Sequence, residues 1–245
     1  MQTELTIESA AAALLFSAVF LVVGPLHPMR WLVREERTAV SFGAGVAIAY
    51  VFVHVMPELS SARHAFSEST SLPVRYDGMS IFYVSLIGFL LFYGLDHLRK
   101  RLHQASAKVR AGKAFKISIT GFAAYVALMA YLLVHNLEDT PRSVALFAVA
   151  IGVHFIGVDR ALHEEYGAVY ERVGRYVLAA MPPLGWGAGM LITLPRSILA
   201  SLVAFISGAV IMNSSITELP SEGDGRFLPF MCGGLVYGLI LLPFG

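Results

Sequence analysis

Eight long apolar stretches constrain the fold of this chain more than any other feature of its sequence. Each is long enough, or nearly so, to cross a hydrocarbon core that needs about 20 helical residues. Because a bilayer offers no partner to unpaired backbone groups, we expect an all-α integral membrane protein, an eight-helix transmembrane bundle that forms one domain over residues 1–245. The predicted helices lie near residues 10–26, 39–56, 79–98, 117–137, 144–162, 176–194, 198–216 and 227–244.

The composition agrees with this class. Apolar residues make up 56% of the chain and charged residues 14%, against roughly a quarter charged in ordinary soluble domains. The net charge of +1 argues against nucleic acid as a partner. Glu4 and Glu8 precede the first stretch without any basic residue, which is unlike a cleavable signal peptide. The single cysteine, Cys232, excludes a disulfide within the chain.

Basic residues predict the orientation. The connection after the third stretch holds all four lysines, Lys100, Lys108, Lys113 and Lys116. The connections on the opposite side hold only four of the 18 Lys and Arg residues, Arg63, Arg75, Arg142 and Arg196. The positive-inside rule therefore places both termini outside and the connection at residues 99–116 in the cytoplasm. We expect a multi-pass protein of the plasma (inner) membrane.

The clearest functional clue is His135-Asn136-Leu137-Glu138-Asp139, which closes the fourth stretch. In a helix, His135 and Asp139 lie four residues apart and share a face. An imidazole and a carboxylate inside a membrane segment, or at its end, are costly unless they are paired or functional. Both groups suit a divalent transition metal. His154 is the only comparably central donor of the next helix. The predicted metal ligands are therefore His135, Asn136, Glu138, Asp139 and His154; a helix end wetted by water is the alternative.

Prolines mark the expected ends of two helices. Pro57 is expected to end the second helix, between His54 and Glu58, which share a helical face. His54 and Glu58 are therefore interpreted as an outward-facing entry vestibule, with a structural helix-end pair as the alternative. Pro182 and Pro183 are expected to break the sixth helix early.

Asp159 and His163 share a face near the cytoplasmic end of the fifth helix, and so do Arg160 and Glu164. Two readings stay open for Asp159 and His163. They form either an exit site for a metal or, with Arg160 and Glu164, a surface salt-bridge network.

These motifs together resemble the ZIP family of divalent-metal transporters. Phe42-Gly43-Ala44-Gly45-Val46 followed by His54-Val55-Met56-Pro57-Glu58 resembles the second helix of that family, and His135-Asn136-x-x-Asp139 resembles its fourth-helix metal motif. Phe205-Ile206-Ser207-Gly208 with Glu218-Leu219-Pro220 resembles the seventh helix. The resemblance implies a ZIP-like fold and a homodimer, in which helices one, four, five and six move against the other four.

The chain also departs from the family pattern. Val158 occupies the position of a fifth-helix acid, Asp159 comes one residue late, and residues 176–194 contain no carboxylate. A two-metal centre of the family type is therefore not expected. We expect instead a single metal site, formed by the ligands named above on the fourth and fifth helices.

From these features we expect a carrier rather than an enzyme. It moves a divalent transition-metal cation towards the cytoplasm by an elevator-type movement, and gradients drive it because no ATP-binding motif is present. Nitrogen and oxygen ligands suit zinc, iron, manganese or cobalt, with zinc the first candidate, and the metal is cargo rather than a cofactor. Two alternatives are open: a ZIP-fold metal sensor or scaffold that has lost transport, and a less favoured haem-binding redox protein that uses His54, His135 and His154.

Overall fold

The computed structural model describes residues 2–22, 36–69, 79–104, 108–135, 141–217 and 226–242. Within these residues every regular element is a helix and none is a strand, so the all-α prediction is confirmed. Four helices of this part are long and apolar enough to cross a membrane: Ser41–Glu68, Ser80–Arg101, Gly112–Val134 and Arg196–Ser215. Two apolar helices, Thr6–Val22 and Phe227–Leu241, are shorter. These helices indicate a membrane protein, whereas eight membrane spans and a ZIP-like arrangement stay predictions.

The chain divides into two units, and each is described by itself. Unit 1 is Met1–Gly24 with Leu90–Leu194, and unit 2 is Pro25–Phe89 with Pro195–Gly245. Unit 1 contains α1 (Gln2–Val22), the second part of α6 (Ser80–Gln104), α7 (Lys108–Val134), α8 (Pro141–Tyr166), the π-helical turn η2 (Tyr170–Gly174) and α9 (Arg175–Leu191). Unit 2 contains α3 (Glu36–Tyr50), η1 (Val51–Val55), α4 (Met56–Ser69), the first part of α6, α10 (Arg196–Met212), η3 (Asn213–Thr217) and α11 (Phe227–Leu241). The prediction of one domain stays a prediction.

Unit 1 packs around Phe155 of α8, a fully buried side chain. In this unit α1 packs against α8 and α9, and α7 packs against α9. Phe16 and Phe20, one turn apart on α1, place their ring centroids 5.2 and 5.3 Å from the centroid of Phe155. Such aromatic pairs contribute about 1 kcal/mol each, and van der Waals packing of this kind holds helices together where no water is present. The aromatic face of α1 thus fixes the helix that carries His154.

The two prolines of α9 do not break the helix, which runs unbroken over Arg175–Leu191, so the predicted early break is wrong. Pro183 has no N–H, and the carbonyl of Ala179, four residues earlier, therefore loses its helical partner. The hydroxyl of Ser17 on α1 donates a hydrogen bond to this carbonyl, with an O···O distance of 2.8 Å. A neighbouring helix satisfies the freed group, which is how membrane helices tolerate proline.

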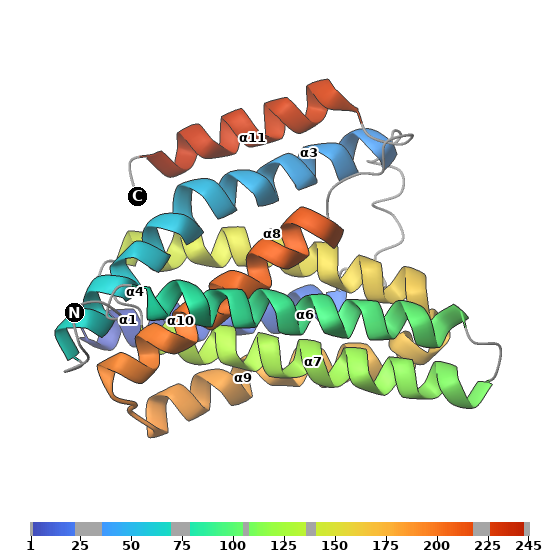
Figure 1. The fold of residues 1–245 in the computed structure, drawn as a ribbon, viewed down its shortest axis with the longest axis horizontal. Helices are drawn as coiled ribbons and strands as arrows, with labels where there is room; N and C mark the ends of the chain where they lie inside the picture. Colours follow the sequence, from blue (N-terminus) through green and yellow to red (C-terminus); the bar gives the residue numbers. More distant parts are fainter. Residues whose placement is uncertain are drawn as a thin grey trace. The chain divides into compact units, whose positions relative to one another are not determined.

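Unit 2 packs through glycines at two helix crossings. A Cβ added to Gly45 of α3 would overlap a backbone carbonyl of α11, and a Cβ added to Gly233 of α11 would overlap one of α3. Gly88 of α6 and Gly208 of α10 have the same reciprocal relation. Small residues permit this close backbone approach. Figure 1 shows α3 and α11 running side by side.

The second predicted helix does not end at Pro57. It continues from α3 through η1 into α4 and ends at Ser69. In η1 the N–H of Met56 donates to the carbonyl of Val51, five residues earlier. This wider turn leaves room for the proline ring, which would clash with a carbonyl in a regular α-helix. The prediction that Pro57 ends the helix is therefore wrong.

The predicted cytoplasmic connection at residues 99–116 is mostly helical. The structure extends α6 to Gln104 and begins α7 at Lys108. Long charged side chains can reach water from a helix end while their stems cover apolar surface. Hydropathy alone therefore placed the end of α6 too early, at residue 98, and the start of α7 too late, at residue 117.

Candidate functional site

His135 lies just beyond α7, which ends at Val134 and not at Leu137 as predicted. Its backbone N–H donates to the carbonyl of Leu132 at 3.0 Å, a short-range bond that closes the last turn. The ring of Tyr131 packs on the imidazole, with centroids 4.9 Å apart. The Nε2 atom is buried and has no hydrogen-bond partner in the described part of the chain. Because buried polar atoms are nearly always paired, this nitrogen is open to a ligand.

The polar residues that follow His135 lie outside the described residues. Asn136, Glu138 and Asp139 precede α8, which begins at Pro141. Because α7 ends at Val134, only the predicted helix end at Leu137 is wrong. The shared face of His135 and Asp139 and the role of the three residues as ligands stay predictions.

His154 is a buried core residue of α8, with 6% of its surface exposed. Its Nε2 lies 3.1 Å from the hydroxyl oxygen of Tyr125 on α7, and the two groups share a hydrogen bond. His154 can therefore coordinate a cation through Nε2 only after this bond opens. Tyr125 could not be singled out from the sequence, because a tyrosine in an apolar stretch is an ordinary packing residue.

No metal centre is complete within the described residues. Among them, no three His, Cys, Asp or Glu residues come together as a group that could hold a metal ion. Zinc sites in proteins use three or four protein ligands. A site at His135 therefore needs the residues that follow it, or a further acid of unit 1.

His54 and Glu58 lie on one helical face as predicted, with 4.0 Å between Nε2 and Oε2. The ring of Tyr50 stacks on His54, with centroids 5.1 Å apart. The pair lies inside a helix that continues to Ser69, so its predicted position at a helix end is wrong for the same reason as the end at Pro57. The role of the pair as an entry vestibule stays a prediction.

Asp159 and His163 have different partners. Asp159, 2% exposed, accepts a hydrogen bond from the hydroxyl of Tyr170, whereas Nδ1 of His163 lies 3.6 Å from a carboxylate oxygen of Glu171. Burial raises the pKa of Tyr170, and its bond to the Asp159 carboxylate raises it further, against the opposing effect of the Arg175 guanidinium. Tyr170 therefore stays a donor. It follows Asp159 by eleven residues, a separation that no helical pattern predicts, and the exit site stays a prediction.

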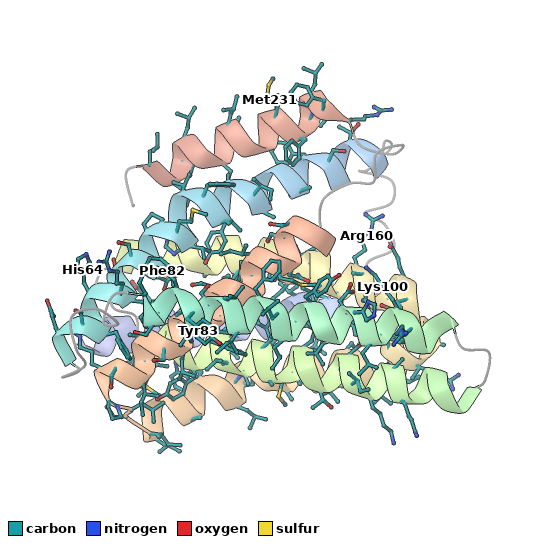
Figure 2. All side chains as sticks on the ribbon, viewed as in Figure 1. His64, Phe82, Tyr83, Lys100, Arg160 and Met231 are labelled. Atoms are coloured by element: carbon teal, nitrogen blue, oxygen red, sulfur yellow. The ribbon has the colours of Figure 1, made fainter. Side chains whose placement is uncertain are left out.

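Ion pairs join α6 to α8 at this end of unit 1. Arg160 binds Glu164 with a distance of 2.7 Å between Nε and Oε1, which confirms the predicted pair. Arg99 of α6 binds Glu165 of α8. Figure 2 shows Lys100 and Arg160 near the same end of the unit. Of the network expected for this region, the pair Arg160–Glu164 is present, whereas Asp159 and His163 contact Tyr170 and Glu171 instead.

No family model matches the chain, and neither a curated protein nor a solved structure matches it. A function for this chain therefore rests on its own residues.

Proposed function

We propose that the chain carries a divalent transition-metal cation across the membrane towards the cytoplasm. The observation that carries the proposal is the buried Nε2 of His135, which has no hydrogen-bond partner among the described residues. Leaving such an atom unpaired costs about 1–3 kcal/mol. A bound cation removes this cost, and imidazole is a common ligand of zinc and iron.

The residues after His135 supply the remaining donors. Glu138 and Asp139 bring carboxylates, and Asn136 brings a carbonyl oxygen, within four residues of the imidazole. This mixture of nitrogen and oxygen suits zinc first, and also iron, manganese and cobalt. His154 is a further ligand if its bond to Tyr125 opens during transport.

The division into units supports a carrier in which one group of helices moves. Unit 1 holds four whole helices, α1, α7, α8 and α9, which are the first, fourth, fifth and sixth helices of the chain, and the second part of α6. The resemblance to the ZIP family assigns movement to these four whole helices. We therefore propose gradient-driven, elevator-type transport by unit 1, in a homodimer of the plasma (inner) membrane.

Metal uptake into lipid vesicles tests the proposal. The purified protein should take up Zn²⁺, Fe²⁺, Mn²⁺ or Co²⁺ saturably, followed with an indicator trapped inside the vesicles. His135→Ala and Asp139→Ala should each abolish this uptake without changing the yield of folded protein. His64→Ala, at an exposed histidine of α4, is the matched control and should transport normally.

Two results would redirect the proposal. Saturable uptake by His135→Ala at the wild-type rate would remove His135 from the site. Metal binding without uptake by the wild-type protein would favour the metal sensor or scaffold.

Cysteine labelling tests the orientation. Lys113, exposed near the start of α7, is replaced by Cys in a Cys232→Ser protein. A membrane-impermeant maleimide should label this cysteine only after the cells are permeabilised, because the basic connection is cytoplasmic. Labelling in intact cells would reverse the proposed topology.

A further inference from the structure

Glu8 is an unexplained acid in the apolar part of α1. It lies in Thr6–Val22, and its Oε2 atom is buried without a hydrogen-bond partner among the described residues. An acidic side chain in a membrane helix is costly and marks a functional position unless it is paired. The adjacent Ser9 accepts a hydrogen bond from the indole N–H of Trp186 on α9 at 3.1 Å, so this turn of α1 lies against unit 1.

Contacts with α9 place Glu8 and His135 at one end of unit 1. Trp186 of α9 meets α1 at the turn of Glu8. Three residues further along α9, a Cβ added to Gly189 would lie 3.0 Å from the Cβ of Val134, the residue before His135. With a rise of about 1.5 Å per residue, Glu8 and His135 lie within about 10 Å of each other along the helix axis.

The direction of α1 brings the carboxylate towards this end. Ser9 meets Trp186 whereas Ser17 meets Ala179, so α1 and α9 run antiparallel. Side chains lean towards the start of their own helix, and Glu8 therefore leans towards the end of unit 1 at which α7 finishes. Figure 1 shows the start of α1 and the last turn of α9 on the left of the view.

We infer that Glu8 is a carboxylate ligand of the cation site at His135. Within the part of the chain that the structure describes, each residue has one buried atom without a partner, an oxygen on Glu8 and a nitrogen on His135. Together they are the donor types that a divalent metal takes. The predicted sixth helix, residues 176–194, contains no carboxylate. The Glu8 carboxylate on the first helix would supply a negative charge to the site instead. The inference rests on the proposed function and adds to it that the cation ties α1 to α7, so that unit 1 moves as one body.

Metal binding by Glu8→Gln tests this inference on the purified full-length protein. The affinity for Zn²⁺ should fall at least about tenfold, since even supporting residues of metal sites have effects of this size. The visible spectrum of bound Co²⁺ should change because the ligand set changes. The metal-free melting temperature should not fall, because the substitution changes an acid whose buried oxygen has no partner among the described residues. Glu8→Asp, which keeps a shorter carboxylate, should bind with intermediate affinity.

Glu164→Gln is the matched control, because Glu164 is an acid of the same unit that already pairs with Arg160. Its Zn²⁺ affinity should equal that of the wild-type protein. Unchanged affinity and an unchanged Co²⁺ spectrum in Glu8→Gln would overturn the inference and leave the proposed function standing. A lower metal-free melting temperature would assign Glu8 a structural role and would also overturn it. A wild-type protein that binds no metal would overturn both.

Discussion

The two units differ in the polar side chains that they bury. Unit 1 buries the ionisable side chains of His154, Asp159 and Arg175 and links its helices through side-chain hydrogen bonds. The buried polar side chains described in unit 2 are hydroxyls and one amide, at Ser41, Ser85, Ser207, Asn213 and Ser214. Helices approach closely through glycine in both units, at Gly185 of α9 in unit 1 and at Gly45 of α3 in unit 2. Buried ionisable groups are costly in a membrane and are kept where they serve a function, which is why we propose the transport site in unit 1.

The largest effect on stability is expected in unit 2, at Gly45. The added Cβ of Gly45→Ala would overlap the carbonyl oxygen of Phe230 on α11, and overpacking of this kind costs about 3 kcal/mol of unfolding free energy. Gly43→Ala, two residues away, is the control because nothing lies within 4 Å of its Cβ position. It should be neutral or stabilising by up to about 1 kcal/mol. Thermal unfolding in detergent measures the stability of both variants. Equal unfolding free energies for Gly45→Ala and Gly43→Ala would mean that α3 and α11 do not cross closely.

An intermediate effect is expected in unit 1, at Ser17. Ser17→Ala leaves the carbonyl of Ala179 without a partner, at a cost of about 2 kcal/mol. Ser201→Ala in α10 is the matched control, because the Ser201 hydroxyl donates to the Ser197 carbonyl of its own helix. Its unfolding free energy should change by less than about 0.5 kcal/mol. If the two variants lost the same stability, the prolines of α9 would not depend on α1.

The smallest effect is expected at Tyr166, whose hydroxyl shares a hydrogen bond of 2.7 Å with Ser118. Tyr166→Phe should lose about 1 kcal/mol at pH 7. Burial raises the pKa of Tyr166 from 10.0 to about 12. The hydroxyl therefore stabilises the fold fully below pH 10, and this contribution is lost as the pH rises towards 12.

Unfolding of Tyr166→Phe at a series of pH values should show a shallower loss of stability between pH 10 and 12 than the wild-type protein. The control is Tyr83→Phe, at a tyrosine with 65% of its surface exposed, which should keep the wild-type slope. If Tyr166→Phe lost stability between pH 10 and 12 as steeply as the wild-type protein, the Tyr166 hydroxyl would not be buried.

Local patterns in the sequence predicted the parts of the structure that depend on local spacing. Apolar stretches located the helices, and the four-residue spacing predicted that Arg160 pairs with Glu164 and that His54 lies beside Glu58. These contacts need only a continuous helix and no knowledge of the tertiary fold.

The remaining features depend on neighbouring segments and could not be read from spacing. The helix continues past Pro57 because a π turn precedes it, and α9 continues through Pro183 with a partner that is 162 residues away from Ala179. Glu8 gained significance only when contacts with α9 placed it near the end of α7. Helix packing supplies these relations, and hydrophobic periodicity does not contain them.

We propose that unit 1, and not unit 2, holds the cation. His135 and His54 form a matched pair for testing it, because each packs against a tyrosine four residues earlier, Tyr131 and Tyr50. The most direct measurement is the amount of Zn²⁺ bound per purified chain at equilibrium dialysis. We predict saturable binding by the wild-type protein and by His54→Ala, and none above background by His135→Ala. Binding that survives in His135→Ala and disappears in His54→Ala would place the site in unit 2 and contradict the claim.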